Sequence, residues 1–342
     1  MPARILIVRF SSIGDIVLTT PVIRCVKQQL GAEIHFLTKR SFAGVLKENP
    51  HIDRLWLIDK EISELAQTLL QQRFTHVLDL HGNLRTRELK IRLALASALH
   101  LRSRPRSYTF PKLNFRKFLL TRFGIDRMPD IHIVDRYLRT AAPLGVVGDG
   151  GGLDYFIAPN DEVDLSAENI PDVYLAFVIG AAHATKRLSE EQLRMFCEVT
   201  VIPVVLLGGP SERETGDRIA RGLPLVINAC GRFNLGGSAS LVRQSVLVVT
   251  HDTGLMHVAA AFRKPIISIW GNTVPALGMY PYLPGQEQLE TERRREVTGL
   301  TCRPCSKIGF SECPEGHFRC IKNQDPKALA EFVRRTYMGI MK

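Results

Sequence analysis

The segment RFSSIGDIVLTTP, residues 9–21, places a carboxylate where many α/β proteins bind phosphate. Residues 5–8 form a short apolar run that predicts a buried strand, and a helical pattern begins soon after it. Phosphate-binding turns at such a position use glycines and free backbone N–H groups. This turn has one glycine and presents Asp15, whose charge repels phosphate. Asp15 therefore needs a role other than anion binding, with capping of the following helix as the simplest alternative.

A second candidate site is the turn HDTG within VLVVTHDTGLMHVAAAF, residues 246–262. It joins an apolar strand to a helix whose first backbone N–H groups are free and favour negative charge. Gly254 allows a ligand to approach the backbone, Thr253 offers a hydroxyl, and His257 follows about one helical turn later. This pattern indicates a diphosphate site. The alternative is that Asp252 or Thr253 only caps the helix and that His257 is structural.

Two further strand ends carry side chains that suit a nucleotide. In GAAHATKR, residues 180–187, Lys186 follows small residues and can reach a phosphate, unless it is an ordinary solvated lysine. In LLGGPSERE, residues 206–214, Glu212 stands at a helix start, where it can accept hydrogen bonds from ribose hydroxyls. The alternative for Glu212 is simple stabilisation by the helix N-terminus.

Alternating strands and helices predict two doubly wound α/β domains. Short segments rich in Ile, Val and Leu predict strands that are covered on both faces. Four glycines between residues 148 and 152, followed by a polar stretch, mark a boundary. We therefore expect an N-terminal domain over 1–150, a linker over 151–172 and a C-terminal domain over 173–342. A final helix over 326–340 can pack back toward the N-terminal domain. The predicted strands are 4–10, 33–38, 54–59, 76–80, 173–180, 203–209, 225–229, 246–250 and 265–271.

The 342-residue chain has a net charge of +11 that is concentrated in one segment. Residues 83–139 contain 14 Lys or Arg and only 4 Asp or Glu. Such a segment suits an anionic membrane surface or an acidic acceptor carried in one, unless it is only a solvated basic face. The motifs of nucleic-acid binders, membrane helices and signal peptides are not found. We therefore expect a cytoplasmic protein that binds no nucleic acid.

Five motifs, in this order, resemble glycosyltransferase family 9, the ADP-heptose–lipopolysaccharide heptosyltransferases. They are ILIVRFSSIGDIVLTTP near the start, DLHGNLRT at 79–86, GAAHATKR at 180–187, LLGGPSERE at 206–214 and DTGLMHVAAAFRKPIISIWG at 252–271. The resemblance covers nearly the whole chain. It implies a GT-B type fold, in which two Rossmann-like domains face each other across a cleft. The nucleotide sugar would bind the C-terminal domain and the acceptor the N-terminal domain.

The resemblance also implies the reaction, an inverting transfer of L-glycero-D-manno-heptose from ADP-heptose to the inner core of lipopolysaccharide. The acceptor would be of the lipid A–Kdo type, which implies a peripheral protein at the inner leaflet of the inner membrane. Asp15 would be the catalytic base that takes the proton of the attacking hydroxyl. The other residues on the acceptor side would be Ser11, Ser12, Gly14, Arg85 and Arg87, the two arginines as contacts for carboxylates or phosphates.

The donor side implied by the resemblance comprises Lys186, Glu212, Asp252, Thr253, Gly254 and His257. Lys186 and the helix N-terminus would stabilise the leaving ADP, so that catalysis requires no metal or other cofactor. The sequence departs from the family at KRLS, where members often have Lys-Arg-Trp-Pro. We therefore expect different local packing at Leu188 and Ser189, with Ser189 as the N-cap of the next helix.

Two other functions are open at this point. A GT-B glycosyltransferase with another nucleotide sugar or another acceptor would keep the same motifs. A non-enzymatic protein that binds polyanions or membranes through residues 83–139 would leave Asp15 and the Asp-Thr-Gly turn without a role.

Four of the seven cysteines cluster near the C-terminus, as Cys302, Cys305, Cys313 and Cys320. Four thiolates this close in sequence can hold zinc tetrahedrally, and the Cys-x2-Cys half is a common zinc half-site. The second half lacks the tight spacing of a zinc ribbon. We therefore expect free thiols in an ordered loop, with a structural zinc site as the alternative.

Overall fold

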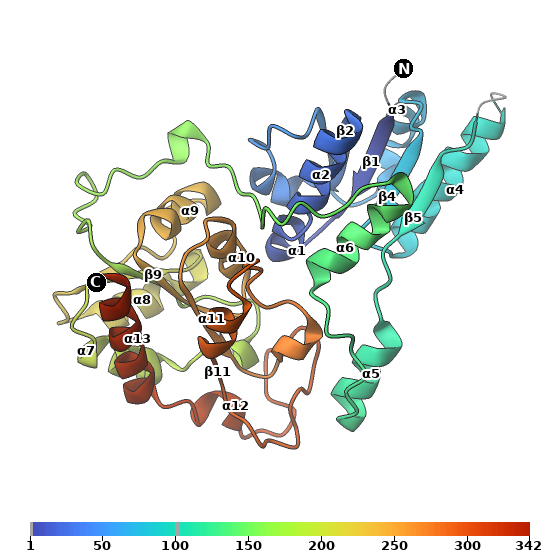
Figure 1. Ribbon diagram of the computed structural model, residues 1–342. Coiled ribbons are helices and arrows are strands. Elements are labelled where there is room, and N and C mark those ends of the chain that lie inside the picture. The colour runs from blue at the N-terminus through green and yellow to red at the C-terminus, as the bar shows by residue number, and fades with distance from the viewer. Residues whose placement is uncertain (1–2, 100–102) are drawn as a thin grey trace. The chain divides into compact units, whose positions relative to one another are not determined.

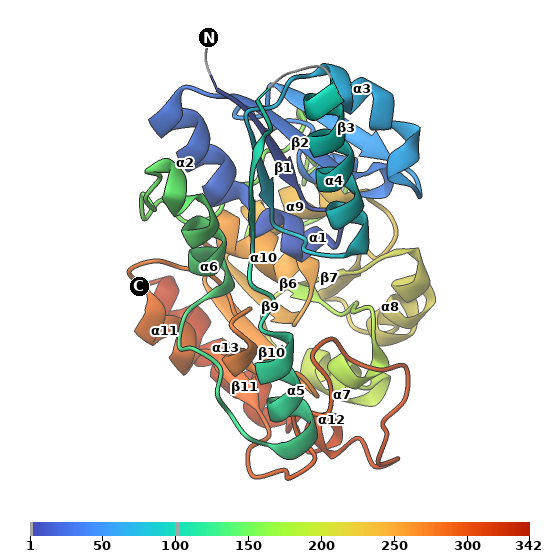
Figure 2. The ribbon, with the colours of Figure 1, turned by 90° about the vertical axis from the view of Figure 1, so that its right-hand side faces the viewer.

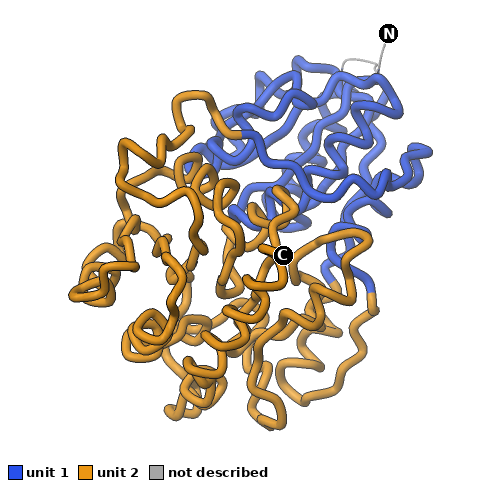
Figure 3. Tube along the Cα trace, turned by 60° about the vertical axis from the view of Figure 1, so that its left-hand side comes forward, with its two compact units in different colours: residues 1–112, 131–156 blue, residues 113–130, 157–342 orange. Residues whose placement is uncertain are grey.

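The computed structural model describes residues 3–99 and 103–342, and the chain divides into two compact units (Figure 3). The first unit contains residues 1–112 and 131–156, and the second contains residues 113–130 and 157–342. The expected linker is therefore shared between the units. The basic segment 83–139 is also divided, because its central part, residues 113–130, belongs to the second unit.

The first unit is built on a parallel sheet with the strand order β3-β2-β1-β4-β5 (Figure 1). Its strands are β1 (Arg4–Val8), β2 (Glu33–Lys39), β3 (Arg54–Ile58), β4 (His76–Asp79) and β5 (Arg106–Thr109). Its α-helices are α1 (Ile13–Val17), α2 (Thr20–Leu30), α3 (Ala66–Gln71), α4 (Leu84–Leu99) and α6 (Ile133–Ala141). The direction in which strands are added reverses between β1 and β4. Loops that follow the two strands at such a reversal form the usual ligand-binding edge of an open α/β sheet.

Side chains of β1 alternate between the two faces of this sheet, because successive residues of a strand point to opposite sides. Leu6 and Val8 belong to a buried cluster that includes Leu89 of α4. Ile5 and Ile7, on the other face, are equally buried. Because both faces are covered, every side chain of the strand interior is apolar.

The helical pattern that follows the first strand is divided into α1 and α2. Between them, the hydroxyl of Thr19 donates to the carbonyl of Ile16 at 2.7 Å, which offers the backbone an alternative to a continuous helix. Pro21 then lies in the first turn of α2, where no backbone N–H is needed. The short α1 therefore carries Asp15 as a separate element directly after β1.

The second unit is built on a parallel sheet with the order β11-β10-β9-β6-β7-β8 (Figure 2). Its strands are β6 (Leu175–Val178), β7 (Val204–Leu207), β8 (Val226–Asn228), β9 (Leu247–His251), β10 (Ile266–Trp270) and β11 (Arg294–Glu296). Its α-helices are α5 (Asn114–Phe123), α7 (Glu190–Val199), α8 (Arg213–Ala220), α9 (Leu235–Gln244), α10 (Gly254–Ala261), α11 (Glu287–Glu292), α12 (Arg319–Lys322) and α13 (Pro326–Ile340). The reversal lies between β6 and β9, so each unit is a doubly wound Rossmann-like domain, as the GT-B type requires.

The final helix, α13, packs against α7 of its own unit. Leu329 and Val333 of α13 are buried in one cluster with Leu193 and Phe196 of α7. These contacts occupy the apolar face of α13. The structure therefore places the helix within the second unit, where the sequence had suggested a return to the N-terminal domain.

Two edge strands, β5 and β11, were not predicted, because their sequences, RSYT and RRE, are polar. Edge strands commonly carry charged side chains, and apolar runs do not reveal them. In the part of the chain that the structure describes, no helix is both long and apolar enough to span a bilayer.

Arg24 of α2 holds the C-terminal segment of the first unit. Its Nε lies 2.7 Å from Asp149, its Nη1 forms a second ion pair with Asp154, and its Nη2 donates to the carbonyl of Gly152 at 2.9 Å. The side chain of Arg24 is only 9% exposed. Its hydrogen bonds to Asp149 lower the pKa of that carboxyl group.

We predict that Arg24→Ala lowers the free energy of unfolding by about 3 kcal/mol, because two carboxylates lose a buried cation. The control is Arg40→Ala, since Arg40 pairs with Asp59 at exposures of 61% and 60%. An exposed pair of this kind contributes at most about 1 kcal/mol. Chemical denaturation of both variants measures the difference, and equal losses would contradict the prediction.

Candidate active site

Asp15 lies in the first turn of α1, at the edge of the sheet where β1 ends. Its Oδ1 is 2.7 Å from Nη2 of Arg9, and its Oδ2 accepts hydrogen bonds from the backbone N–H (3.2 Å) and the hydroxyl (2.9 Å) of Ser12. Ser12 is the N-cap residue of α1, and Asp15, three residues later, forms the capping box with it. Its side chain is still 19% exposed, so that a ligand can reach the carboxylate.

The charge of Asp15 is set by two opposing effects. Burial alone would raise its pKa, but the charge of Arg9 and the hydrogen bonds from Ser12 outweigh burial and lower it. Arg9 is itself fixed, because Nη1 donates to the carbonyl of Leu80 (2.7 Å) and to the hydroxyl of Tyr137 (3.0 Å). Asp15 is therefore a fully ionised carboxylate at neutral pH.

The loop after β4 lies beside this carboxylate and is shaped by Asp79. Oδ1 of Asp79 accepts from the backbone N–H groups of His81 (3.1 Å) and Gly82 (2.7 Å), and Oδ2 accepts from Nζ of Lys90 (2.8 Å). Gly82 has φ +61°, a conformation that glycine adopts without strain. The motif DLHGNLRT thus builds a tight turn that presents the imidazole of His81.

His81 is held as a neutral imidazole. Burial, followed by the nearby charges of Arg9 and Lys112, lowers its pKa to about 4. Its Nδ1 is buried and has no hydrogen-bond partner among residues 3–99 and 103–342. A neutral imidazole can accept or donate a hydrogen bond, and the described residues leave this capacity of the buried Nδ1 unused.

The two arginines expected at the acceptor lie in the first turn of α4. Arg85 is partly exposed, and its Nη2 lies 3.8 Å from Glu61. Arg87 is exposed. The structure thus leaves both side chains accessible to an anion, but no contact brings either of them to Asp15.

In the second unit, Lys186 forms an ion pair with Asp252. Nζ of Lys186 is 2.6 Å from Oδ2 of Asp252, and both side chains are nearly buried. The hydroxyl of Thr273 donates to the same oxygen at 2.9 Å. The pair connects the loop after β6 with the turn after β9, the two strands at which the strand order reverses. The structure thus brings together two of the expected donor residues.

The turn after β9 also provides a helix N-terminus. Thr253 is the N-cap of α10, and its buried hydroxyl has no partner within the described part of the chain. Gly254 begins the helix, and His257 is buried in it one turn later. The free N–H groups of the first turn favour an anion, and a diphosphate site at this turn stays a prediction.

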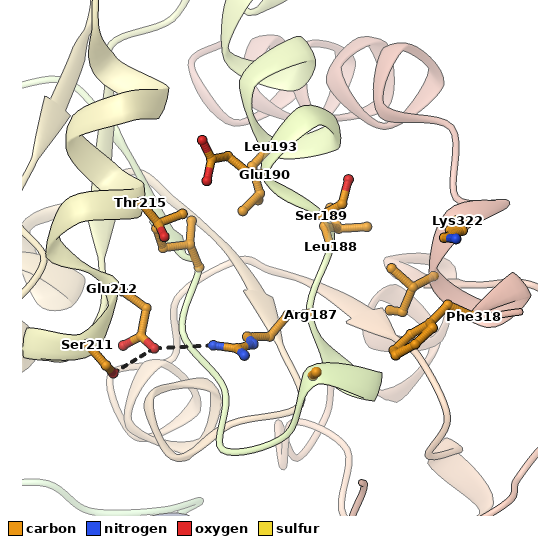
Figure 4. Close-up of a pocket in the computed structure, with 13 residues that line it drawn as sticks. Arg187, Leu188, Ser189, Glu190, Leu193, Ser211, Glu212, Thr215, Phe318 and Lys322 are labelled. Atoms are coloured by element: carbon orange, nitrogen blue, oxygen red, sulfur yellow. Dashed lines mark hydrogen bonds and ion pairs between the residues drawn. The ribbon is translucent and has the colours of Figure 1, made fainter. Parts of the chain in front are cut away.

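Glu212 lies in the turn after β7, directly before α8, and faces Arg187 (Figure 4). Its Oε1 is 3.4 Å from Nη1 of Arg187 and accepts from the hydroxyl of Ser211 at 2.9 Å, while Oε2 accepts from the backbone N–H of Gly209 at 2.8 Å. A Cβ atom at Gly180 would lie 3.0 Å from Oε2, so glycine leaves space for the carboxylate. Arg187, Ser211 and Glu212 border a cavity of about 310 Å³, near the lower limit for small-molecule sites.

The two residues that depart from the family pattern have clear structural roles. Leu188 is buried in the core cluster of the second unit and lines the same cavity. The hydroxyl of Ser189 accepts from the backbone N–H of Gln192 at 3.2 Å and caps α7, as predicted. The backbone N–H of Leu188 donates to Nε2 of the buried His251 at 3.1 Å, which fixes the start of this segment.

Sequence reasoning missed Arg9, His81, Arg187 and Thr273 as members of the two sites. Each of them follows a predicted strand or lies at its end, and this position is the sequence feature that could have identified them. A charged residue such as Arg9 at the carboxyl end of an otherwise apolar strand indicates a site, since the strand interior excludes unpaired charge.

The buried histidines make stability depend on pH. Burial lowers the pKa of His251 to about 4, whereas an unfolded histidine has a pKa of about 6.5. Between these values the unfolded chain binds a proton that the folded chain does not, so stability is full above pH 6.5 and falls as the pH is lowered toward 4.

We predict a loss of roughly 2 kcal/mol from His251 alone at pH 5. Urea unfolding at pH 7.5 and pH 5 measures it, and His251→Gln, which keeps an acceptor for Leu188, should show a smaller difference than the wild type. Equal differences in the two proteins would rule out His251 as the source.

Glycosyltransferase family 9 (heptosyltransferase) matches residues 62–298 of this chain. Lipopolysaccharide heptosyltransferase 1 of Pseudomonas aeruginosa is 26% identical over 335 residues, which cover 89% of this chain and 86% of that protein. Lipooligosaccharide heptosyltransferase 2 of Haemophilus influenzae is 36% identical over 77 residues, 21% of this chain and 22% of the length of that relative. A solved E. coli heptosyltransferase with ADP-2-deoxy-2-fluoro heptose is 21% identical, covers 97% of this chain and 99% of that chain, and has a TM-score of 0.65. With the family matched over most of the chain, the protein belongs to glycosyltransferase family 9, the heptosyltransferases.

Proposed function

We propose that this protein transfers L-glycero-D-manno-heptose from ADP-heptose to an inner-core acceptor of the lipid A–Kdo type, with inversion at the anomeric carbon. The relationship to lipopolysaccharide heptosyltransferases and the likeness to an enzyme solved with an ADP-heptose analogue support the donor. The observation that carries the mechanism is the environment of Asp15, an ionised and accessible carboxylate beside a neutral imidazole.

In this proposal Asp15 is the general base. A carboxylate offers about four positions for hydrogen bonds, and three are taken by Arg9 and Ser12. The remaining position accepts the acceptor hydroxyl, whose oxygen attacks the anomeric carbon while its proton passes to Asp15. The ion pair with Arg9 lowers the pKa of Asp15 and so makes it a weaker base, but the same pair keeps the carboxyl group ionised. The proton is taken as the C–O bond forms, when the attacking oxygen has become acidic.

The leaving diphosphate is assigned to Lys186, Thr253 and the first N–H groups of α10. As the bond between the anomeric carbon and the phosphate oxygen breaks, negative charge grows on ADP, and these groups stabilise it. Asp252 holds the ammonium of Lys186 in place in the absence of donor. We therefore assign Asp252 to positioning of Lys186, since its own charge opposes a phosphate.

The nucleoside is assigned to the cavity beside Glu212. Its carboxylate is anchored by Gly209 and Ser211, and it can accept hydrogen bonds from both hydroxyls of a ribose. Apolar lining from Leu188 and Phe318 suits the faces of a base.

Helix α5 is assigned to the anionic membrane surface. Phe115, Phe118 and Phe123 are 72%, 52% and 60% exposed, and basic residues interleave with them. Exposed aromatic side chains among cationic ones are typical of a helix that lies in a lipid interface. This supports a peripheral location at the inner leaflet, where a lipid-linked acceptor is found.

We predict that Asp15→Asn lowers turnover by about 10²–10⁴-fold, because the amide cannot accept the proton. ADP affinity should persist, since the donor contacts are assigned to the second unit. Some stability should be lost, because Arg9 loses its charged partner. The matched control is Asp53→Asn, since Asp53 also accepts from a cation, Lys27, and from a backbone N–H.

Turnover, ADP affinity and melting temperature are measured for both Asp→Asn variants. The control should lose stability and keep its turnover. Near-normal turnover of folded Asp15→Asn would remove Asp15 from the mechanism.

We predict that Arg85→Ala combined with Arg87→Ala raises KM for the acceptor severalfold and leaves KM for ADP-heptose unchanged, because each arginine can pair with a carboxylate or phosphate. Arg40→Ala, another exposed arginine of the first unit, is the control. Steady-state kinetics with each substrate varied in turn separate the two constants. A parallel rise in both would argue against an acceptor role.

A further inference from the structure

The four clustered cysteines converge on one small cavity in the second unit. Cys302, Cys305, Cys313 and Cys320 all border this cavity, whose volume is about 10 Å³. Such a volume holds one atom of the size of a water molecule. Cys320 comes from α12, and the other three come from the irregular chain before it. The long spacing between the two halves therefore does not keep the thiols apart.

His317 indicates that the sulfur of Cys302 serves as a hydrogen-bond acceptor. The backbone N–H of Arg319 donates to Nδ1 of His317 at 3.0 Å, so the proton of the neutral ring is on Nε2. Nε2 lies 3.7 Å from Sγ of Cys302. This N–H therefore points at the sulfur of Cys302, which places His317 in the outer shell of the cysteine cluster.

Arg303 supplies positive charge at the same cavity. Its side chain is 7% exposed, and Nη2 donates to the carbonyl of Thr273 at 2.8 Å. Four thiolates around a divalent cation carry a net charge of −2, which a buried guanidinium partly offsets. Glu296 also forms an ion pair with Arg303, at 2.7 Å, and neutralises part of the guanidinium charge.

We propose that Cys302, Cys305, Cys313 and Cys320 bind one Zn²⁺ as a tetrathiolate. Binding displaces four thiol protons and forms four Zn–S bonds of about 2.3 Å. As the side chains stand, no three His, Cys, Asp or Glu residues in the described ranges are at coordinating positions. Coordination therefore requires the four thiols to turn toward the cavity they already border. This convergence reverses the preference for free thiols that the spacing alone had suggested.

The zinc would hold the loop that carries Lys186. Between the second and third cysteines, the backbone N–H of Phe310 donates to the hydroxyl of Thr185 at 2.9 Å, and the N–H of Thr185 donates to the carbonyl of Phe310 at 3.2 Å. Lys186 is the next residue. A Cβ at Gly271, on the other side, would lie 2.2 Å from the carbonyl of Thr185, so this loop has no room to move there. The role in donor binding rests on the proposed function, whereas the metal site does not.

The test is the metal content of the full-length protein, purified without chelator and exchanged into metal-free buffer. We expect about one zinc per chain. Cys305→Ser and Cys313→Ser, one from each half, should each lose most of it, since a missing ligand weakens binding by at least about tenfold. The control is Cys197→Ala, a buried cysteine of α7 outside the cluster, which should keep its zinc.

A measurement on the wild type avoids variants that fail to fold. Modification of the thiols in the presence of a colorimetric zinc chelator should release about one zinc for four cluster thiols. Zinc-free protein, or zinc retained in both serine variants, overturns the site.

ADP affinity, measured separately, should fall about tenfold when zinc is removed, because a structural metal fixes its ligating loop. Unchanged affinity overturns the link to Lys186. Zinc content is measured without donor or acceptor. A negative result for the metal site is therefore distinct from a negative result for the proposed function.

Discussion

Both candidate sites depend on one constraint, that the strands of a parallel sheet all end at the same edge. Where the strand order reverses, the loops after two adjacent strands leave in opposite directions and open a space between them. In the first unit these strands are β1 and β4, which bring Asp15 and His81 to one edge. In the second they are β6 and β9, which bring Lys186 to Asp252. Residues far apart in the sequence thus meet without any special local motif.

The two edges carry opposite charge arrangements that suit opposite halves of a group transfer. The first keeps a carboxylate ionised by pairing it with the buried Arg9, and it keeps the neighbouring imidazole neutral by burial. The second gathers Lys186, Arg187 and the N-terminus of α10, with Asp252 and Glu212 as counter-charges. In the proposed function, removal of the proton and stabilisation of the leaving anion therefore belong to different sheets, so the carboxylate of Asp15 and the phosphates have separate sites.

Much of this organisation could be predicted from the sequence, since buried parallel strands are continuous apolar runs and their ends are visible as polar turns. The positions of Asp15, Lys186, Glu212 and Thr253 follow from that pattern. Their partners do not, because Arg9 reaches Asp15 through a turn whose backbone path no periodicity encodes. The polar edge strands β5 and β11 and the transfer of residues 113–130 to the second unit were also hidden, since both depend on tertiary contacts.

The ion pair between Lys186 and Asp252 has a consequence for product release. Asp252 lies 2.6 Å from the ammonium of Lys186, so in the proposed function a diphosphate that binds Lys186 exchanges one anionic partner for another. The net free energy gained on binding is therefore smaller than the contact itself would suggest. When the nucleotide leaves, Asp252 can pair with Lys186 again, so the ammonium is not left unpaired in a nearly buried site. An internal carboxylate that competes with the ligand would shorten the lifetime of the proposed complex with ADP, and this would favour a high turnover rate over tight retention of product.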